Sequence, residues 1–537
     1  MLVRRKKICL ISFGIMSVFL MAGLCLLRMR LAVSDGNVKQ SCYFTLPPDP
    51  GQEDPLLYLN DDFTVQEGFH SNLPIIILSM DGELPEYKSF SVGEERVTGE
   101  EPYIRGSVRI IDGDGEFNYI TDNPVMESRL HIKKRGHTSF TFDKEQYLLK
   151  LETADGMANK VDVLGMGEHD SWILNGSMAD KSMIRNYLAY RIAAEVDETT
   201  PDSRFCEVIL QKGDQYVYQG LYLIMETITR SENRIDIDEY KAKNTYSSYI
   251  VRRDRRTSFD KMLDTYGRLS GLSDEWIGLK YPSERKLTKN TMRYIEEDFS
   301  RIEKVLYSDE KNVFVTYGRY IDIHSFVDYF LLNEYFGNYD AGMHSTYMYK
   351  NSGERLKIGP VWDFDQAMNN YFLEEMNTET LAFQERPFFK QLCTDKRFID
   401  LLQSRYAELE RSSLNGEHID DVINETSAHI RSAREREWNR WEADYGDGSG
   451  TNWHNYYLLD YLDDDGTLIS RFNEDYDQEI YNIKVYLHKH GKAMETQLQF
   501  LEKTTIYDTS IQNEKELLLL AVLILFFLPA AVLLRRG

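Results

Sequence analysis

The chain has 537 residues, of which 42% are hydrophobic and 28% charged, a composition typical of a globular protein and not of a disordered one. Its 87 Asp and Glu residues outnumber its 63 Lys and Arg residues, which gives a formal net charge of −24. A protein this acidic is repelled by nucleic-acid phosphates, which argues against nucleic acid as a partner. The five cysteines lack the number and spacing of a disulfide framework or a zinc site.

Two apolar segments near the ends of the chain predict membrane anchors. Residues 8–27 and residues 517–534 are uncharged and long enough to cross a bilayer as helices. Lys and Arg residues precede the first segment and follow the second, so the positive-inside rule places both termini in the cytoplasm. The sequence thus predicts a two-pass protein of the cell membrane whose large domain is extracytoplasmic. A cleaved signal peptide is the alternative for the first segment.

The N-terminal part between these segments reads as a linker followed by β-strands. The polar stretch 31–70 contains several prolines, which predicts a linker. Apolar and alternating runs then predict strands, and turn signals that contain glycine follow them. These strands cover residues 73–78, 106–112, 129–134 and 147–151.

The rest of the chain combines helices with further strands. A helical pattern over residues 180–196 places Ile184, Leu188 and Ile192 on one face, with Asp180 as the expected N-cap. The fold class expected from these patterns is α+β, with a β-rich N-terminal part and a helical C-terminal part, flanked by two transmembrane helices. The other predicted strands are 207–210, 216–225 and a hairpin within 345–363, and the other predicted helices are 288–307, 320–336 and much of 395–505.

The stretch Val-Trp-Asp-Phe-Asp at residues 361–365 carries the strongest chemical signal. If the preceding strand continues, Asp363 and Asp365 point to the same side, because strand side chains alternate with period two. Two converging carboxylates repel each other unless a cation or a proton lies between them. Mg²⁺ bound by one or two carboxylates and by substrate phosphates satisfies this requirement. A surface turn with solvated acids is the alternative.

Two basic positions upstream could meet an anion. Arg135 and Gly136 precede Ser139 in a turn between two predicted strands, where backbone N–H groups and the guanidinium can bind a phosphate. A plain hairpin turn is the alternative. Lys150 ends an apolar strand, and a buried ammonium there requires an anionic partner unless the side chain reaches solvent.

Further polar residues follow in the order in which a phosphotransferase carries its catalytic base and its metal ligand. Glu226 ends an apolar strand and is a candidate partner for Arg185 or Lys150. Asp340 lies in a loop 23 residues before Asp363, the order of a base followed by a metal ligand. In protein kinases the fifth residue after the catalytic Asp is a metal-binding Asn, and here it is Ser345.

Taken in order, these motifs resemble the spore coat protein H (CotH) kinase-like family. They are Arg135-Gly-x-x-Ser139, Tyr147-Leu-Leu-Lys150, Asp180-x4-Arg185-Asn186, Gly220-x-Tyr222-x3-Glu226, Asp340 and Trp362-Asp-Phe-Asp365, within about residues 70–400. The resemblance implies an atypical two-lobed fold related to protein kinases. It also implies transfer of the γ-phosphoryl group of ATP to protein Ser or Thr hydroxyls, with ATP and Mg²⁺ as cofactors.

The same resemblance assigns roles to residues. Asp340 is the expected catalytic base, and Lys150 both holds the nucleotide phosphates and supports catalysis. The other expected nucleotide-binding residues are Arg135, Ser139 and Glu226. The expected metal ligands are Asp363, Asp365 and Ser345. Ion pairs of Asp180, Arg185 and Glu226 are expected to position Lys150.

The domain plan expected from the sequence has five parts. They are a cytoplasmic N-terminus with its anchor (1–30), the linker (31–70), the CotH kinase-like domain (71–400), a helical extension (401–515) and the second anchor with a short tail (516–537). A catalytically inactive surface or envelope module for adhesion or spore-coat assembly is the alternative function. A metal-dependent hydrolase using the three aspartates is a third, although such sites often contain a histidine cluster that is absent here.

Overall fold

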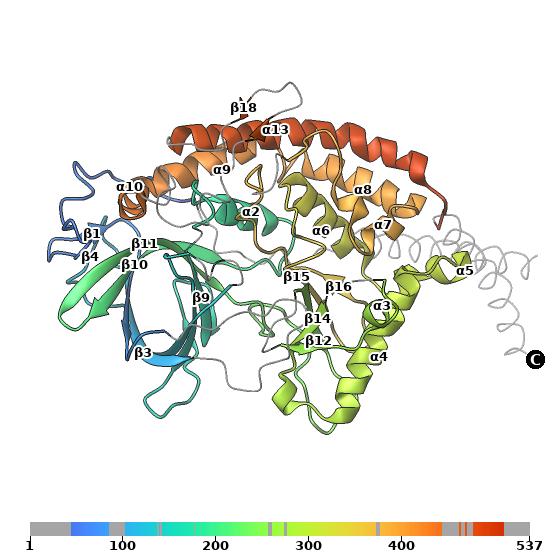
Figure 1. Ribbon diagram of the computed structural model, residues 1–537, viewed down its shortest axis with the longest axis horizontal. Helices are drawn as coiled ribbons and strands as arrows, with labels where there is room; N and C mark the ends of the chain where they lie inside the picture. Colours follow the sequence, from blue (N-terminus) through green and yellow to red (C-terminus); the bar gives the residue numbers. More distant parts are fainter. Residues whose placement is uncertain are drawn as a thin grey trace, which may run out of the picture.

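The computed structural model describes residues 45–84, 103–136, 139, 142–176, 178–255, 260–272, 276–371, 376–442, 461–462, 468–469 and 476–509. Within these residues the fold is α+β, with a β-rich N-terminal part and a helical C-terminal part, as the sequence predicted (Figure 1). Two separate β structures lie below a layer of helices in Figure 1, and the space between them contains the candidate site described below.

The first β structure is a closed barrel, in the order β10-β11-β9-β6-β5-β3-β2. Neighbouring strands within the barrel are antiparallel, except for β10 and β2, which close the barrel as a parallel pair. A closed barrel leaves no unpaired sheet edge, which a sheet of this length otherwise exposes. The strands are β2 (Ile75–Met80), β3 (Ile104–Ile111), β5 (Met126–Lys134), β6 (Tyr147–Glu152), β9 (Ser171–Asn175), β10 (Ser203–Lys212) and β11 (Gln215–Glu226).

Strand alternation gives the barrel an apolar interior and a polar outer face on one side. In β5 and β6, Ile132 pairs with Leu149 and both are buried in the barrel core. The next pair, Lys133 and Leu148, faces the opposite way and lines a cavity outside the barrel. The period of two therefore decides which side chains of these strands are available to a ligand.

The second β structure is a five-stranded antiparallel sheet in the order β13-β14-β12-β15-β16. The amphipathic helix α4 (Lys289–Leu306) packs next to it, as Figure 1 shows, and Thr288 caps its first turn by accepting from the Thr291 amide. The strands are β12 (Tyr249–Asp254), β13 (Lys261–Met262), β14 (Trp276–Tyr281), β15 (Thr346–Lys350) and β16 (Lys357–Ile358).

The helices form a layer that contacts both β structures. The helix α2 is buried almost all round, whereas α13 runs over α6, α8 and α9 along the top of Figure 1. The helix α10 packs on β11 of the barrel. The helices of this layer are α2 (Arg185–Ala193), α6 (Ile323–Tyr335), α8 (Lys396–Leu409), α9 (Gly416–His429), α10 (Arg431–Arg440) and α13 (Tyr476–Phe500).

The prediction that Asp180 caps a helix is wrong. The helix begins at Arg185, and Ile184 stands at its N-cap without a side-chain hydrogen bond. Asp180 is fully buried in the preceding turn, where its carboxylate accepts from the Arg185 amide at 2.9 Å. The sequence pattern also missed β9, β12 and β14, because short strands with both faces buried or with charged residues show little alternation.

The prediction of two transmembrane helices, and with it the two-pass membrane location, is corrected. In the part of the chain that the structure describes, no helix is long and apolar enough to cross a bilayer. The longest helix among the described residues, α13, has 25 residues but carries charged and polar side chains along its length. The predicted segments 8–27 and 517–534 lie outside the described residues.

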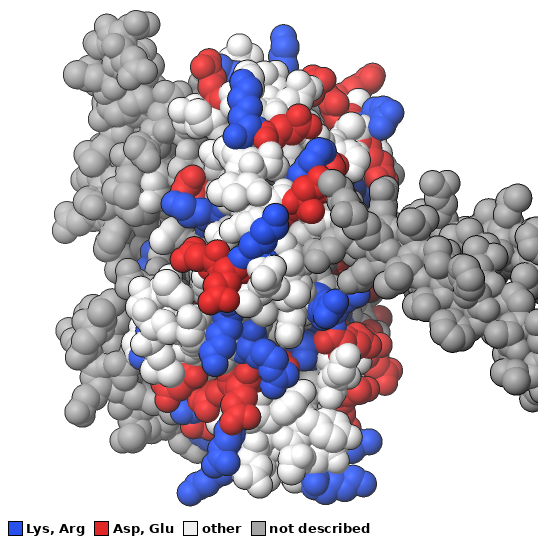
Figure 2. Space-filling view, turned by 90° about the vertical axis from the view of Figure 1, so that its right-hand side faces the viewer, with Lys and Arg blue, Asp and Glu red and all other residues white. Residues whose placement is uncertain are grey.

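Charges of both signs alternate over the face of the molecule shown in Figure 2. Lys and Arg side chains lie next to Asp and Glu side chains there, and neither sign forms a continuous patch among the coloured residues.

A buried histidine connects α13 to α6 and predicts a pH-dependent stability. The ring of His490 lies between the carbonyl oxygen of Thr378 at 3.0 Å and the Glu334 carboxylate at 3.2 Å. Burial alone lowers the pKa of His490, but the hydrogen bond and charge of Glu334 outweigh burial and hold the pKa above its usual 6.5.

Because the folded pKa of His490 is raised, its contribution to stability is complete below about pH 6.5 and is lost as the pH rises through the folded value. We expect the melting-temperature difference between the wild type and His490→Gln to be larger at pH 5.5 than at pH 8.5. Thermal melts of both proteins across this range measure it. A difference that stays constant with pH contradicts the prediction.

Candidate active site

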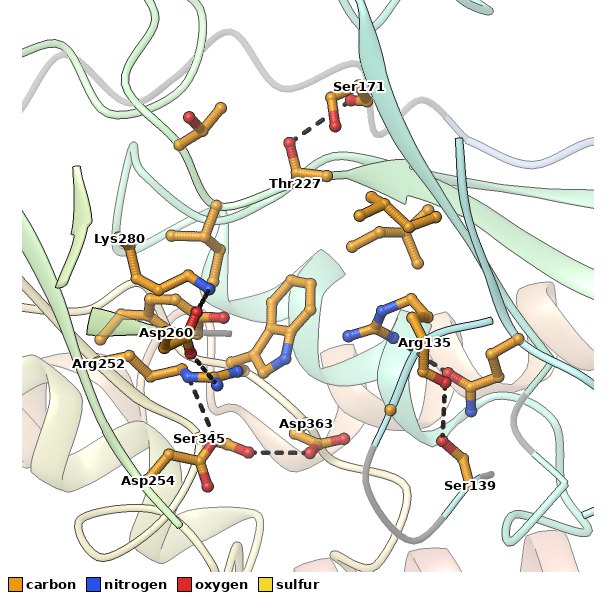
Figure 3. A pocket seen from close by; sticks show the side chains of 18 of the residues that line it. Arg135, Ser139, Ser171, Thr227, Arg252, Asp254, Asp260, Lys280, Ser345 and Asp363 are labelled. Carbon is orange, nitrogen blue, oxygen red and sulfur yellow. Dashed lines mark hydrogen bonds and ion pairs between the residues drawn. The ribbon is translucent and has the colours of Figure 1, made fainter. Parts of the chain in front are cut away.

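A cavity of about 530 Å³ lies between the barrel and the five-stranded sheet (Figure 3). We call it the central cavity. Strands β5, β6 and β9 supply one wall, and β12, β14 and the loops around residues 340–345 and 362–366 supply the other. Of the residues predicted from the sequence, those that line it are Arg135, Ser139, Lys150, Asp340, Ser345, Asp363 and Asp365.

The barrel wall of the central cavity is basic. Lys133 and Lys150 lie on the same outer face of the neighbouring strands β5 and β6, and both line the cavity. Their ammonium groups lie 5.2 and 4.6 Å from the centre of the Tyr103 ring. Lys150 is exposed, whereas Lys133 is only 7% exposed. Sequence reasoning missed Lys133, although its spacing two residues before Arg135 is a usable signal on a strand.

The turn after β5 places Arg135 above the cavity. Its guanidinium donates to the side-chain oxygen of Gln146 at 3.0 Å and lies 5.8 Å from the centre of the Trp362 ring. Ser139 donates its hydroxyl to the Arg135 carbonyl at 3.3 Å, which closes the turn. Gly136 has φ +114, and a Cβ there would stand 1.7 Å from the Ser139 hydroxyl, so the turn requires glycine.

The opposite wall carries the acidic stretch, but not on a strand. β16 ends at Ile358, and Asp363 has φ +67, so the expected strand alternation is wrong. The stretch is instead an irregular loop, in which the buried Phe364 separates Asp363 from Asp365. Both carboxylates still line the central cavity, and Asp363 accepts a hydrogen bond from the Ser345 hydroxyl at 3.1 Å (Figure 3).

Helix α2 holds this acidic loop in place. The side-chain oxygen of Asn186 accepts from the Phe364 amide at 2.7 Å, and the Tyr190 hydroxyl accepts from the Asp363 amide at 3.2 Å. Arg185 donates to the carbonyl oxygens of Ala367 and Met368 at 3.0 and 3.3 Å. The motif residues Arg185 and Asn186 therefore act on the acidic loop, and they do not position Lys150.

The two loop carboxylates are held in surroundings that disfavour their charge. Burial, and next the charge of Asp340, raises the pKa of Asp363, although Arg135 and the Ser345 hydroxyl oppose this. Burial and the charge of Asp363 raise the pKa of Asp365 well above its usual range. Such a pair gains stability when a cation binds between its members.

A divalent cation therefore suits these residues, provided that a ligand such as a phosphate completes its coordination. Among the described residues, no group of three or more His, Cys, Asp or Glu side chains could hold a metal ion by itself. Mg²⁺ is commonly held by one or two carboxylates together with substrate phosphates. Asp363 and Asp365, with the Ser345 hydroxyl beside them, fit that pattern.

The loop that carries Asp340 is fixed by two arginines from different parts of the chain. Arg253 of β12 is fully buried and donates to the Gly342 carbonyl at 3.0 Å. Arg386 donates to the carbonyl of Tyr339, and burial lowers its pKa while Asp340 raises it. Asp340 itself is half-buried and lines the cavity, so its carboxylate is accessible to a ligand there.

Two predicted acids, Glu226 and Asp180, are not among the residues that line the cavity. The carboxylate of Glu226 lies 3.5 Å from Arg234 and accepts from the Asp202 amide at 2.9 Å. Asp180 forms a buried ion pair with Arg185 at 2.6 Å. Both acids therefore bind arginine side chains away from the cavity, and neither of them contacts Lys150.

A second group of cavity residues was missed by the sequence analysis. Arg252 pairs with Asp260 at 2.9 Å and with Asp254 at 3.2 Å, and Lys280 pairs with Asp260 at 3.1 Å. They come from β12, β14 and the segment before β13, and all four line the cavity near Ser345 (Figure 3). The alternation of Arg252 and Asp254 on a strand was the available signal.

The central cavity has lysine and arginine side chains on its barrel wall and the carboxylates of Asp340, Asp363 and Asp365 on the opposite wall, an arrangement that suits a charged ligand. The family model described as CotH kinase protein matches residues 132–467. The chain belongs to this family, which indicates a kinase-like function and, in general terms, the use of ATP, a metal ion and a protein substrate. A comparison with curated proteins found no match.

Proposed function

We propose that this chain is a protein kinase-like enzyme that transfers the γ-phosphoryl group of ATP to Ser or Thr hydroxyls, with Mg²⁺ as the metal ion. The observation that carries the proposal is the central cavity, where Lys133, Arg135 and Lys150 face Asp340, Asp363 and Asp365. Lysine and arginine suit nucleotide phosphates, and paired carboxylates suit the metal that accompanies them. Membership of the CotH kinase protein family supports the same assignment.

In this proposal each wall of the cavity has a different task. Lys133, Lys150 and Arg135 bind and orient the phosphates from the barrel side, and Ser139 completes the turn that carries Arg135. Asp363 and Asp365, with Ser345, would hold Mg²⁺, which when bound neutralises charge on the phosphates. Asp340 accepts the proton of the acceptor hydroxyl. Catalysis then rests mostly on positioning and electrostatic stabilisation.

The direct test uses the full chain with radiolabelled ATP, Mg²⁺ or Mn²⁺, and a mixture of protein acceptors. We expect transfer of label and a melting temperature that rises with nucleotide concentration, since a ligand that binds the folded state stabilises it. Absence of both label transfer and nucleotide-induced stabilisation would overturn the proposal. Stabilisation without transfer to any acceptor would favour the inactive envelope module.

The two lysines provide a sharper prediction. We expect Lys133→Met and Lys150→Met each to raise the KM for ATP by about 10- to 100-fold, since a hydrogen bond to a charged group contributes about 1.5–3 kcal/mol. The effect should be larger for Lys133, because it is the more buried of the two.

Lys134→Met is the matched control for these variants. Lys134 follows Lys133 on β5, pairs with Glu145 and is not among the residues that line the cavity. Steady-state kinetics over a range of ATP concentrations measures all three variants. Equal KM values for Lys133→Met and Lys134→Met would contradict a role of Lys133 in nucleotide binding.

A further inference from the structure

The guanidinium of Arg185 connects the acidic loop to a helix beyond the matched family region. Arg185 is 2% exposed, and its two terminal nitrogens lie 2.6 Å from Asp180 and 2.6 Å from Glu479. The same side chain donates to the carbonyl oxygens of Ala367 and Met368. Glu479 lies in the first turn of α13, whereas the family match ends at residue 467.

We propose that Glu479 is a positioning residue, which holds the acidic loop through Arg185 and so makes α13 a part of the catalytic unit. The consequence for catalysis rests on the proposed function, but the mechanical connection does not. Because a guanidinium is planar, fixing its two terminal nitrogens on two carboxylates also fixes the direction of its Nε–H toward Ala367.

The loop needs such a support because its backbone is strained. Asp363, Met368 and Asn369 have φ values of +67, +53 and +61, in a region that residues other than glycine rarely occupy. Conformations of this kind persist only where surrounding contacts impose them. The contacts from Arg185 meet the loop at Ala367 and at Met368, which is itself strained and directly precedes the strained Asn369.

Both carboxylates stabilise the buried charge of Arg185 and hold its side chain in place. Burial alone lowers the pKa of this guanidinium, and the charges of Glu479 and Asp180 outweigh burial and raise it. Removing one partner from a buried ionic network leaves charge uncompensated, which is destabilising. Loss of Glu479 should therefore favour conformations in which the Arg185 side chain moves out of this site.

Helix α13 is well placed to act as a fixed support. The Tyr406 hydroxyl of α8 donates to the Gly491 carbonyl at 2.6 Å, and His490 contacts the Glu334 carboxylate on α6. Gly491 packs so closely that a Cβ there would stand 2.9 Å from the Tyr335 ring. These contacts hold the helix against α6, the helix that leads to the Asp340 loop.

Hydrogen exchange in the full chain tests the connection without any ligand. The amides of Phe364, Ala367 and Met368 donate to the Asn186 side chain, the Phe364 carbonyl and the Phe336 carbonyl, so their exchange reports opening of the loop. We expect Glu479→Gln to speed exchange in a peptide covering residues 363–370 by at least tenfold. Glu479→Asp keeps the charge but shortens the side chain by one methylene, so we expect an intermediate exchange rate, and this variant tests the contact if Glu479→Gln does not fold. Loop exchange equal to that of the wild type in both variants would overturn the inference.

A matched control separates positioning from general destabilisation. Leu487→Ala removes a buried side chain from the same helix and leaves the contact between Glu479 and Arg185 intact. We expect this variant to lower the melting temperature without a selective change of exchange in residues 363–370. Equal loop exchange in Leu487→Ala and Glu479→Gln would mean that Glu479 acts only through stability, and the inference would fall.

Binding of Mn²⁺ with ATP, followed by the electron paramagnetic resonance of Mn²⁺, distinguishes this inference from the proposed function. We expect Glu479→Gln to weaken Mn²⁺ binding about tenfold and Leu487→Ala to leave it unchanged. If the wild type binds no Mn²⁺ with ATP but loop exchange responds to Glu479→Gln, the positioning role stands and the proposed function falls. Unchanged Mn²⁺ binding in Glu479→Gln would overturn the catalytic consequence.

Discussion

Replacement of Asp363 by asparagine is expected to reduce phosphoryl transfer by at least about 10²-fold, the scale on which loss of one preorganised electrostatic group acts. Asparagine keeps the shape of the side chain and can still accept from Ser345, so the change removes mainly the negative charge. That charge is what would hold Mg²⁺ next to the phosphates. Initial rates with radiolabelled ATP at saturating Mg²⁺ measure the effect.

The same variant should fold at least as well as the wild type. A carboxyl whose pKa is higher in the folded state than in the unfolded state destabilises the folded state as the pH rises above the unfolded value. Asparagine removes this cost, so the melting temperature without ligand should be equal or higher at pH 7. A lower melting temperature would show that the loss of activity comes from misfolding.

Asp170→Asn is the matched control for Asp363→Asn. Asp170 also lines the central cavity, but from the barrel side, where its carboxylate lies 3.2 Å from the His169 ring. We expect this variant to retain most of the activity. Equal losses in the two variants would contradict the assignment of Asp363 as the metal ligand, because they would indicate a general effect of negative charge in the cavity.

Replacement of Glu437 by glutamine is expected to destabilise the protein by about 3–5 kcal/mol, the range for breaking a buried ion pair from one side. Glu437 is fully buried, and Lys144 is 1% exposed with its ammonium 2.6 Å from the carboxylate. Burial lowers the pKa of Lys144, and Glu437 is the main opposing charge. Without Glu437 this ammonium has to be buried uncompensated or lose its proton.

The same carboxylate fastens α10 to the barrel. Its second oxygen accepts from the Leu221 amide at 2.7 Å, and a Cβ at Gly220 would stand 2.0 Å from that oxygen. The glycine in the Gly220-x-Tyr222 motif is thus explained by the close approach of Glu437. The Glu437→Gln variant should therefore weaken the packing of α10 on β11.

A double variant tests whether the effect belongs to the pair. Replacing Lys144 by methionine in the Glu437→Gln background removes the uncompensated charge, so we expect recovery of a large part of the lost stability. Glu435→Gln, on the exposed face of α10, is the control and should change stability little. Urea unfolding followed by tryptophan fluorescence measures all of these proteins. If the double variant loses as much unfolding free energy as Lys144→Met and Glu437→Gln lose together, the stabilising effect does not belong to the pair.

Much of the candidate site could be predicted from the order of short motifs. Asp340, Asp363, Lys150 and Arg135 were selected by residue type and spacing, and the structure brings them to one cavity. The argument that led to Asp363 and Asp365 was nevertheless wrong in detail, since these residues lie in a loop and not at the end of a strand. Residue type was therefore a better guide than the assumed local backbone.

Other assignments failed because motif order carries no information about long-range partners. Glu226 fits the motif series, but its carboxylate lies next to Arg234 and outside the group of residues that line the cavity. Arg185 was expected near Lys150, whereas it meets Asp180 and Glu479. Charged side chains pair according to the packing of their elements, and this packing cannot be read from spacing alone.

By itself, the sequence determined the α+β class, six of the seven barrel strands, most of the long helices, the family and the main acidic and basic positions of the site. These features depend on local periodicity and on short motifs, which neighbouring residues encode. Only the tertiary structure decided that the barrel closes, that Lys133 faces the cavity, and that Glu479 meets Arg185 across 294 residues of chain. Such contacts follow from the way complete elements bury their apolar faces, so no single segment of the chain contains them.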